Sequence, residues 1–237
     1  MTIRETRSGT VVPEDGWPPH RIGAFVDAVL AIAVTLLVVE LERPGREDTG
    51  SVNALAEFLW HERSSFVALV LAFFLLWSVW RRHHVLIYQV ERVDRYTLAA
   101  HAPMLLFAAV LPFVTAVFGS ASGNPLAVCL FAGVAAMLFA SEAVIKETAA
   151  RRSVLAARVT PADLRSNANG SYAVATVFAA TAALAWLTSY VWLVWLFAPL
   201  GATLGGLVIC RVRTVPAGEV RDAIVAKPRR RRIRPND

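Results

Sequence analysis

A few ionisable side chains interrupt the long apolar stretches of this sequence and could carry chemistry. They are Arg21, Asp27, His83, His84, His101 and Glu142. Such groups are costly in hydrocarbon, so each one predicts a transport pathway or a buried polar network. Adjacent histidines on a helix project about 100° apart, so His83 and His84 cannot both easily face one metal ion. The pattern therefore predicts proton transfer or helix bracing, and no metal site.

Asp27 lies in the first third of the apolar stretch 21–41, and the residues leave two interpretations open. In the first, Asp27 forms a salt bridge or a hydrogen-bonded cluster with Arg21 or a histidine and stabilises a helical bundle. In the second, Asp27 and His101 belong to a proton pathway or a proton-coupled transporter.

The same stretch carries a second, apolar face. Ile32, Leu36 and Val39 are spaced i, i+4 and i+7 and fall within roughly 60° on a helix, with Phe25 in register below and Thr35 at the flank. Asp27 projects roughly 140° from Ile32. If one of these faces lines a pathway, we expect the other to pack against neighbouring helices.

Known enzyme signatures are absent from the sequence, which contains no HExxH, GxSxG, P-loop or GxGxxG motif. A potassium-filter sequence such as TVGYG is also missing. Cys129 and Cys210 both lie in apolar blocks and predict buried free thiols. We therefore expect no enzyme and no cofactor.

The elements that position these residues are predicted to be membrane helices. Of the 237 residues 56% are hydrophobic and 18% are charged, against about a quarter charged in soluble domains. Six apolar blocks approach the roughly 20 residues that a helix needs to cross a bilayer. They cover residues 22–41, 64–80, 97–118, 125–145, 170–188 and 190–210. The predicted fold class is all-α, a polytopic membrane protein with six transmembrane helices.

The basic residues test this topology. With the N-terminus inside, 21 of the 24 Lys and Arg residues fall in inside segments and three fall outside. This predicts a multi-pass plasma membrane protein with both termini cytoplasmic, and it explains the net charge of +6 without nucleic acid. Residues 1–20 lack a signal-peptide core, so we expect the first helix to be retained.

The predicted organisation has three parts. They are a cytoplasmic segment 1–20, a membrane domain 21–211 and a basic cytoplasmic tail 212–237 that could contact anionic lipid. The inner connection 146–169 is predicted to be partly helical, and Thr160 and Asp163 in TPAD resemble a capping box.

Three motifs carry a family resemblance. Arg21-x-x-x-Phe25-Val26-Asp27 resembles the R-x-x-x-F-S-D signature in the first helix of the transmembrane protein 175 family. Trp80-x-x-His83-His84 is similar to that family's W-x-x-H-H, and Pro112-Phe113-x-Thr115 is similar to its third-helix region. The resemblance is good over roughly residues 20–120.

This resemblance implies a homotetrameric potassium channel with six helices per subunit and four first helices around a central pore. It implies a hydrophobic constriction at Ile32, Leu36 and Val39, with Thr35 linked to selectivity. It also implies a network that braces the pore helix. The network residues would be Arg21, Phe25, Asp27, Trp80, His83, His84 and His101, with His84 the favoured histidine.

Two positions depart from the family pattern. Val26 replaces the motif serine, and His101 stands where the family often has Asn, which makes it a possible new partner for Asp27. A proton-coupled transporter and a non-conducting structural or sensory protein remain the alternatives to the channel.

Overall fold

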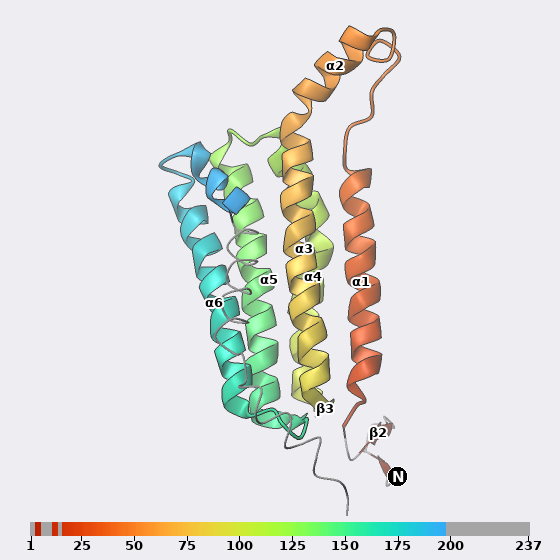
Figure 1. The fold of residues 1–237 in the computed structure, drawn as a ribbon, viewed down its shortest axis with the longest axis vertical. Coiled ribbons are helices and arrows are strands. Elements are labelled where there is room, and N and C mark those ends of the chain that lie inside the picture. Colours follow the sequence, from red (N-terminus) through yellow and green to blue (C-terminus); the bar gives the residue numbers. More distant parts are fainter. Residues whose placement is uncertain (1–2, 6–10, 14–15, 198–237) are drawn as a thin grey trace, which may run out of the picture. The chain divides into compact units, whose positions relative to one another are not determined.

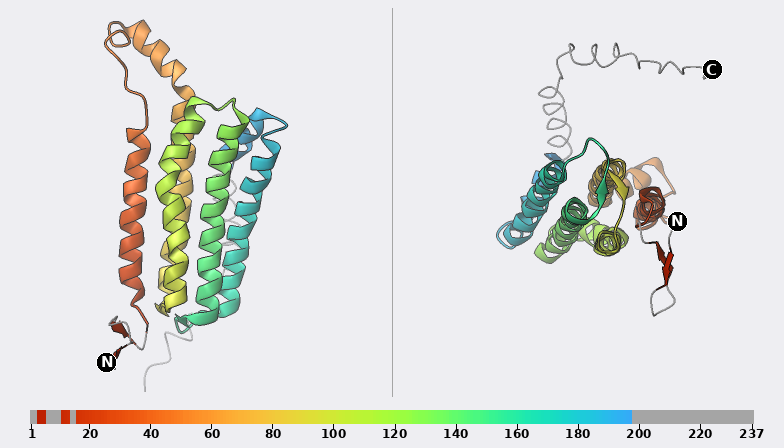
Figure 2. Two further views of the ribbon diagram at one scale, coloured as in Figure 1. Left: turned by 180° about the vertical axis from the view of Figure 1, so that it is seen from behind. Right: turned by 90° about the horizontal axis from the view of Figure 1, so that it is seen from below.

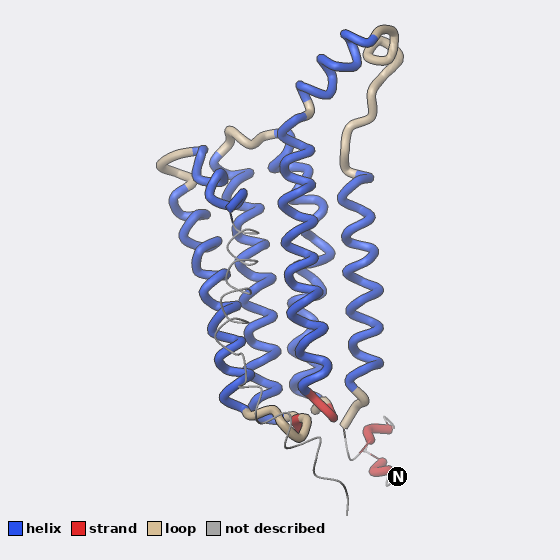
Figure 3. The backbone as a smooth tube through the Cα atoms, viewed as in Figure 1, coloured by secondary structure: helices blue, strands red, loops and turns tan. Residues whose placement is uncertain are grey.

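Residues 3–5, 11–13 and 16–197 are described by the computed structural model, and most of them are helical (Figure 1; Figure 3). The helices are α1 (Pro19–Val39), α2 (Val52–His61), α3 (Arg63–Gln89), α4 (Arg95–Ser120), α5 (Pro125–Arg152) and α6 (Pro161–Leu184), followed by a 3₁₀ helix η1 (Ser189–Phe197). The all-α expectation is confirmed.

Within the described residues, four helices are long and apolar enough to cross a membrane: α1, α3, α4 and α5. They contain the first four predicted apolar blocks. The fifth block lies largely in α6, whose first turns carry polar residues such as Asp163, Arg165 and Asn167. The sixth block begins in η1, and its remainder lies outside the described residues.

The helices differ from the apolar blocks at their ends. α3 continues to Gln89 rather than ending near residue 80, and α5 continues to Arg152. The connection 42–63, between the first two apolar blocks, contains α2, whose N-cap Ser51 accepts a hydrogen bond from the backbone N–H of Ala54 (3.1 Å). Hydropathy finds only the part of a helix that is apolar, whereas backbone hydrogen bonding continues into polar sequence.

Residues 16–194 contain one helical bundle. α5 packs between α4 and α6, while α1 packs against both α3 and α4 (Figure 2). Consequently α1 contacts its own bundle along one side only.

Short strands join the two basic connections to each other at one end of the bundle. β3 (Val90–Arg92) pairs with β4 (Val154–Leu155), and Trp17 exchanges backbone hydrogen bonds with Val93 (2.9 and 3.0 Å). β1 (Ile3–Glu5) and β2 (Val11–Pro13) form a separate antiparallel pair. α2 and the 121–124 turn lie at the opposite end (Figure 1). The fold therefore places the segment before α1 on the same side as both basic connections, as the charge count requires.

Polar side chains define the helix starts. Asp94 accepts from the backbone N–H groups of Thr97 (2.8 Å) and Tyr96 (3.2 Å) at the start of α4. Thr160 and Asp163 form the predicted capping box of α6. These side chains satisfy backbone donors that a helix start leaves unpaired.

Candidate functional site

The predicted constriction residues lie on a face of α1 that its own bundle leaves uncovered. Ile32 is 59% exposed and Val39 60%, and Leu36 is exposed as well. Leu30 and Leu37, on the opposite side, are each only 2% exposed. We call Ile32, Thr35, Leu36 and Val39 the α1 stripe. An isolated protomer leaves this apolar stripe open, so something outside the protomer must cover it or it must face lipid.

Thr35 uses its hydroxyl proton within the helix. Its Oγ1 donates to the backbone carbonyl of Ile32 (2.8 Å), and its side chain is exposed beside Ile32 and Leu36. The oxygen lone pairs on this exposed hydroxyl are the polar feature of an otherwise apolar stripe.

Asp27 contacts the neighbouring helix through Trp80. The indole Nε1 donates to Asp27 Oδ1 (3.0 Å), and the Trp80 ring stacks on His84 (centroids 5.2 Å apart). The structure thus brings Asp27, Trp80 and His84 together. Arg21 is exposed, and its guanidinium has no ion pair within the described residues, so the expected Arg21–Asp27 contact is not found there.

His83 belongs to a different buried group, with His101. The two Nε2 atoms lie 3.1 Å apart, and His101 Nδ1 lies 2.7 Å from the Thr97 carbonyl. A carbonyl only accepts, so His101 Nδ1 carries a proton and, in a neutral pair, its Nε2 accepts from His83 Nε2–H. Both nitrogens of His101 are engaged, and the expected contact between His101 and Asp27 is not found.

Val26 faces the interior of the bundle and is fully buried. Phe25, its neighbour in the motif, is 60% exposed. The position that holds serine in the family signature is therefore a buried position here, and it takes no part in the Asp27–Trp80 hydrogen bond.

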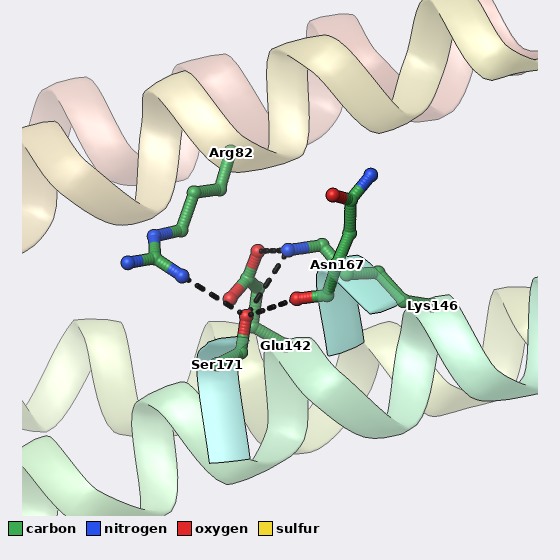
Figure 4. Close-up of polar contacts among 5 residues, drawn as sticks. All are labelled: Arg82, Glu142, Lys146, Asn167 and Ser171. Atoms are coloured by element: carbon green, nitrogen blue, oxygen red, sulfur yellow. Dashed lines mark hydrogen bonds and ion pairs between the residues drawn. The ribbon is translucent and has the colours of Figure 1, made fainter. Parts of the chain in front are cut away.

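A second polar cluster, buried and charged, lies between α3, α5 and α6 (Figure 4). Glu142 forms an ion pair with Lys146, and Lys146 donates to Ser171 (3.1 Å). Arg82 donates to the same Ser171 oxygen (3.2 Å). Glu142 is only 1% exposed, so removing its partner would leave a buried polar group uncompensated. Sequence reasoning singled out Glu142 but missed its partners, although Glu142 and Lys146 are spaced i, i+4 in an apolar block.

The described residues contain no group of three or more His, Cys, Asp or Glu side chains that could hold a metal ion. At the end of the bundle that carries α2, a cavity of about 280 Å³ lies between α1, α3 and α4. Glu40, Glu42 and Glu62 line it, together with Ser65, Thr115 and Ser120. The α2 end of α1 therefore adjoins an acidic recess.

Comparison with known proteins finds a family whose sequence resembles part of this chain. Residues 21–112 match the sequence profile of the family described as endosomal/lysosomal potassium channel TMEM175. This region contains α2, α3, nearly all of α1 and the first two-thirds of α4. The predicted family resemblance is confirmed over this region. TMEM175 is a family of ion channels, not a class of enzymes.

Individual relatives with related names are also similar to this chain. The chain is 33% identical over 100 residues to a potassium channel of Streptomyces collinus, an alignment covering 40% of this chain and 45% of that protein. It is 32% identical over 120 residues to a potassium channel of Chamaesiphon minutus, covering 48% of this chain and 57% of that one. The chain therefore spans about half the length of the curated relatives it matches.

The fold comparison extends further. A crystal structure described as a lysosomal potassium-selective channel TMEM175 homolog from Chamaesiphon minutus superposes with a TM-score of 0.67. The match covers 78% of this chain and 96% of that chain at 21% sequence identity. At this identity the comparison shows that the helical fold is shared.

Proposed function

We propose that this protein is a potassium-permeable channel whose permeation is controlled by the α1 stripe. The observation that carries the proposal is the uncovered apolar face of α1, in which Ile32 and Val39 are exposed while Leu30 and Leu37 are buried. The family match of residues 21–112 and the relatives named potassium channels support it.

The proposed pore is formed by a homotetramer with six membrane helices per subunit. Four copies of α1 surround the axis, so that each α1 stripe faces the other three. This arrangement removes the stripe from lipid and lets the opposite face of α1 keep its contacts with α3 and α4. The membrane domain is residues 21–211 in the plasma membrane, and both 1–20 and 212–237 are cytoplasmic.

Control of permeation follows from the chemistry of the stripe. Four Ile32 side chains form a narrow neck that resists wetting, and Leu36 and Val39 extend it. An ion that passes must shed water, which costs less free energy for potassium than for sodium. Thr35 adds a ring of hydroxyl oxygens within the neck.

The bracing network holds the pore helix at a fixed rotation. Asp27 binds Trp80 from α3, and His84 stacks on the same indole. His83 and His101 join α3 to α4, on which α1 also packs. Phe25 and Arg21, at the start of α1, are the remaining members of the proposed bracing network. Rotation of α1 would open or close the neck. Such a rotation must either break the Asp27–Trp80 hydrogen bond or move Trp80 together with α1.

Potassium and sodium flux into liposomes containing purified protein tests this proposal. Ile32→Ala shortens the side chain at the neck in all four subunits. We expect potassium flux to rise roughly ten-fold, equal to about 1.4 kcal/mol of barrier, and the preference over sodium to fall. Val38→Ala is the matched control, since Val38 is 61% exposed on the same helix but projects about 120° from Ile32.

The outcomes separate the candidate functions. Unchanged flux and selectivity in Ile32→Ala, or an equal effect of Val38→Ala, would contradict the constriction. Flux that is driven by a pH gradient and lost in a properly assembled Asp27→Asn variant would instead indicate a proton-coupled transporter. The absence of any ion flux would indicate a structural or sensory protein.

A further inference from the structure

Tyr96, at the end of the bundle that carries the basic connections, contacts two arginines at once. The Arg95 guanidinium carbon lies 4.7 Å from the centroid of the Tyr96 ring, and that of Arg152 lies 4.3 Å from it. Arg95 also donates from Nη2 to the Tyr96 hydroxyl (2.8 Å). One aromatic ring thus joins a cation from the first turn of α4 to a cation from the last turn of α5.

Carboxylates do not neutralise this pair through hydrogen bonds. Within the described residues neither Arg95 nor Arg152 forms a salt bridge, whereas the adjacent Arg151 is paired with Glu147 (2.7 Å). Asp94 interacts electrostatically with Arg152, but its oxygens already accept the N–H groups of Tyr96 and Thr97. Burial raises the pKa of Asp94, yet these hydrogen bonds and the charge of Arg152 together hold it below its ordinary value. Asp94 therefore remains an ionised helix cap, and two guanidinium groups keep most of their N–H donors free.

The position of the pair relative to the membrane is set by α4. At about 1.5 Å per residue, its 26 residues span about 39 Å, longer than the roughly 30 Å hydrocarbon core. The first turn of α4 therefore reaches the headgroup region. Arg95 also heads an exposed stripe along α4 that continues at three- and four-residue steps through Ala99, Ala102, Leu106, Ala109 and Phe113.

We propose that Arg95, Tyr96 and Arg152 bind the phosphate of an anionic phospholipid, whose acyl chain lies along the exposed α4 stripe. Guanidinium groups match phosphate with paired N–H donors, and stacking on Tyr96 fixes their planes in advance. The adjoining apolar stripe favours a lipid over a soluble phosphate, because it offers a surface for an acyl chain. This surface is separate from the α1 stripe, and lipid binding there does not depend on ion conduction.

Native mass spectrometry of the purified full chain tests the proposal, with phosphatidylglycerol and phosphatidylcholine supplied in equal amounts. We expect selective retention of phosphatidylglycerol. Arg152→Gln and Arg95→Gln should each weaken it about five-fold, as expected for loss of one basic residue at the membrane surface. Arg151→Gln is the matched control, because it removes the same charge from the neighbouring position but leaves Arg95, Tyr96 and Arg152 in place.

The variants Arg95→Lys and Arg152→Lys keep the positive charge. They therefore serve as controls in case the glutamine variants fail to fold. We expect them to fold and to retain phosphatidylglycerol less well than the parent, since an ammonium lacks the planar paired donors. Equal retention of both lipids by the parent, or an equal loss in Arg151→Gln, would overturn the proposal. Displacement of the lipid by inorganic phosphate alone would also overturn it, because the site would then be one for a soluble anion.

Discussion

At the residue scale, Asp27 shows how an acid can be kept inside an apolar helix. It lies eight residues after Pro19, about 12 Å along α1, where an unpaired carboxylate would be costly. The indole N–H of Trp80 supplies a donor from a neighbouring helix. The Asp27 carboxylate therefore points toward α3, and the α1 stripe contains no charged side chain.

Removing the indole donor should therefore destabilise the protein. For Trp80→Phe we expect a loss of about 1.5–3 kcal/mol, the usual range for a hydrogen bond to a charged group. Trp77→Phe is the control, since the Trp77 ring contacts the Trp80 ring (4.9 Å between centroids) but gives no hydrogen bond to Asp27. Thermal unfolding in detergent measures both changes. Equal losses in the two variants would show that ring packing, not the hydrogen bond, matters at this position.

At the element scale, α3 and α4 approach closely at Gly119. A Cβ atom added there would lie 2.8 Å from the Cα of Ser65 and 3.1 Å from its Oγ. Backbone cannot yield as a flexible side chain can, so the two helices would have to separate. This contact lies at the α2 end of the bundle, where Ser65 and Ser120 also line the acidic cavity.

Gly119→Ala should consequently destabilise the bundle despite the higher helix propensity of alanine. We expect a cost of about 1–3 kcal/mol from overpacking. Gly133→Ala in α5 is the matched control, because an added Cβ meets nothing within 4 Å there and gains up to about 1 kcal/mol of helix propensity. The midpoint of thermal unfolding should fall in the first variant and hold or rise in the second. A stable Gly119→Ala protein would mean that the α3–α4 contact adjusts freely.

At the scale of the whole molecule, the proposed homotetramer depends on the uncovered face of α1. If four α1 stripes surround one axis, Ile32 residues of different subunits lie close together. Leu30, two residues earlier, packs into its own bundle at 2% exposure.

Single cysteines distinguish these positions in a background with Cys129 and Cys210 replaced by Ala. We expect Ile32→Cys to form covalent dimers rapidly under mild oxidation in membranes. Leu30→Cys should remain monomeric on a denaturing gel, since its thiol faces α3 and α4 of the same chain. The absence of cross-linking at Ile32, together with cross-linking at a different exposed face, would contradict a central position for α1.

Hydropathy, the charge count and the motifs predicted several features of the fold from the sequence. The first four apolar blocks lie in membrane-length helices, the basic connections share one end, and TPAD is a capping box. Helix α2 was not predicted, because its ten residues are too few to cross a membrane and lie within an acidic connection. The partners of Glu142 were also missed, since Arg82 and Lys146 were interpreted as inside-facing charges of the connections.

The sequence by itself determined which four segments form helices long and apolar enough to cross a membrane, and on which side of the bundle the basic connections lie. Both depend on the transfer of individual residues from water, which is a local property. Tertiary structure alone decided that Asp27 pairs with Trp80 and that His101 pairs with His83. These choices depend on the rotation of each helix against its neighbours, which is fixed by packing between residues far apart in the chain. The same rotation decided that Val26 is buried and that Ile32 faces outward.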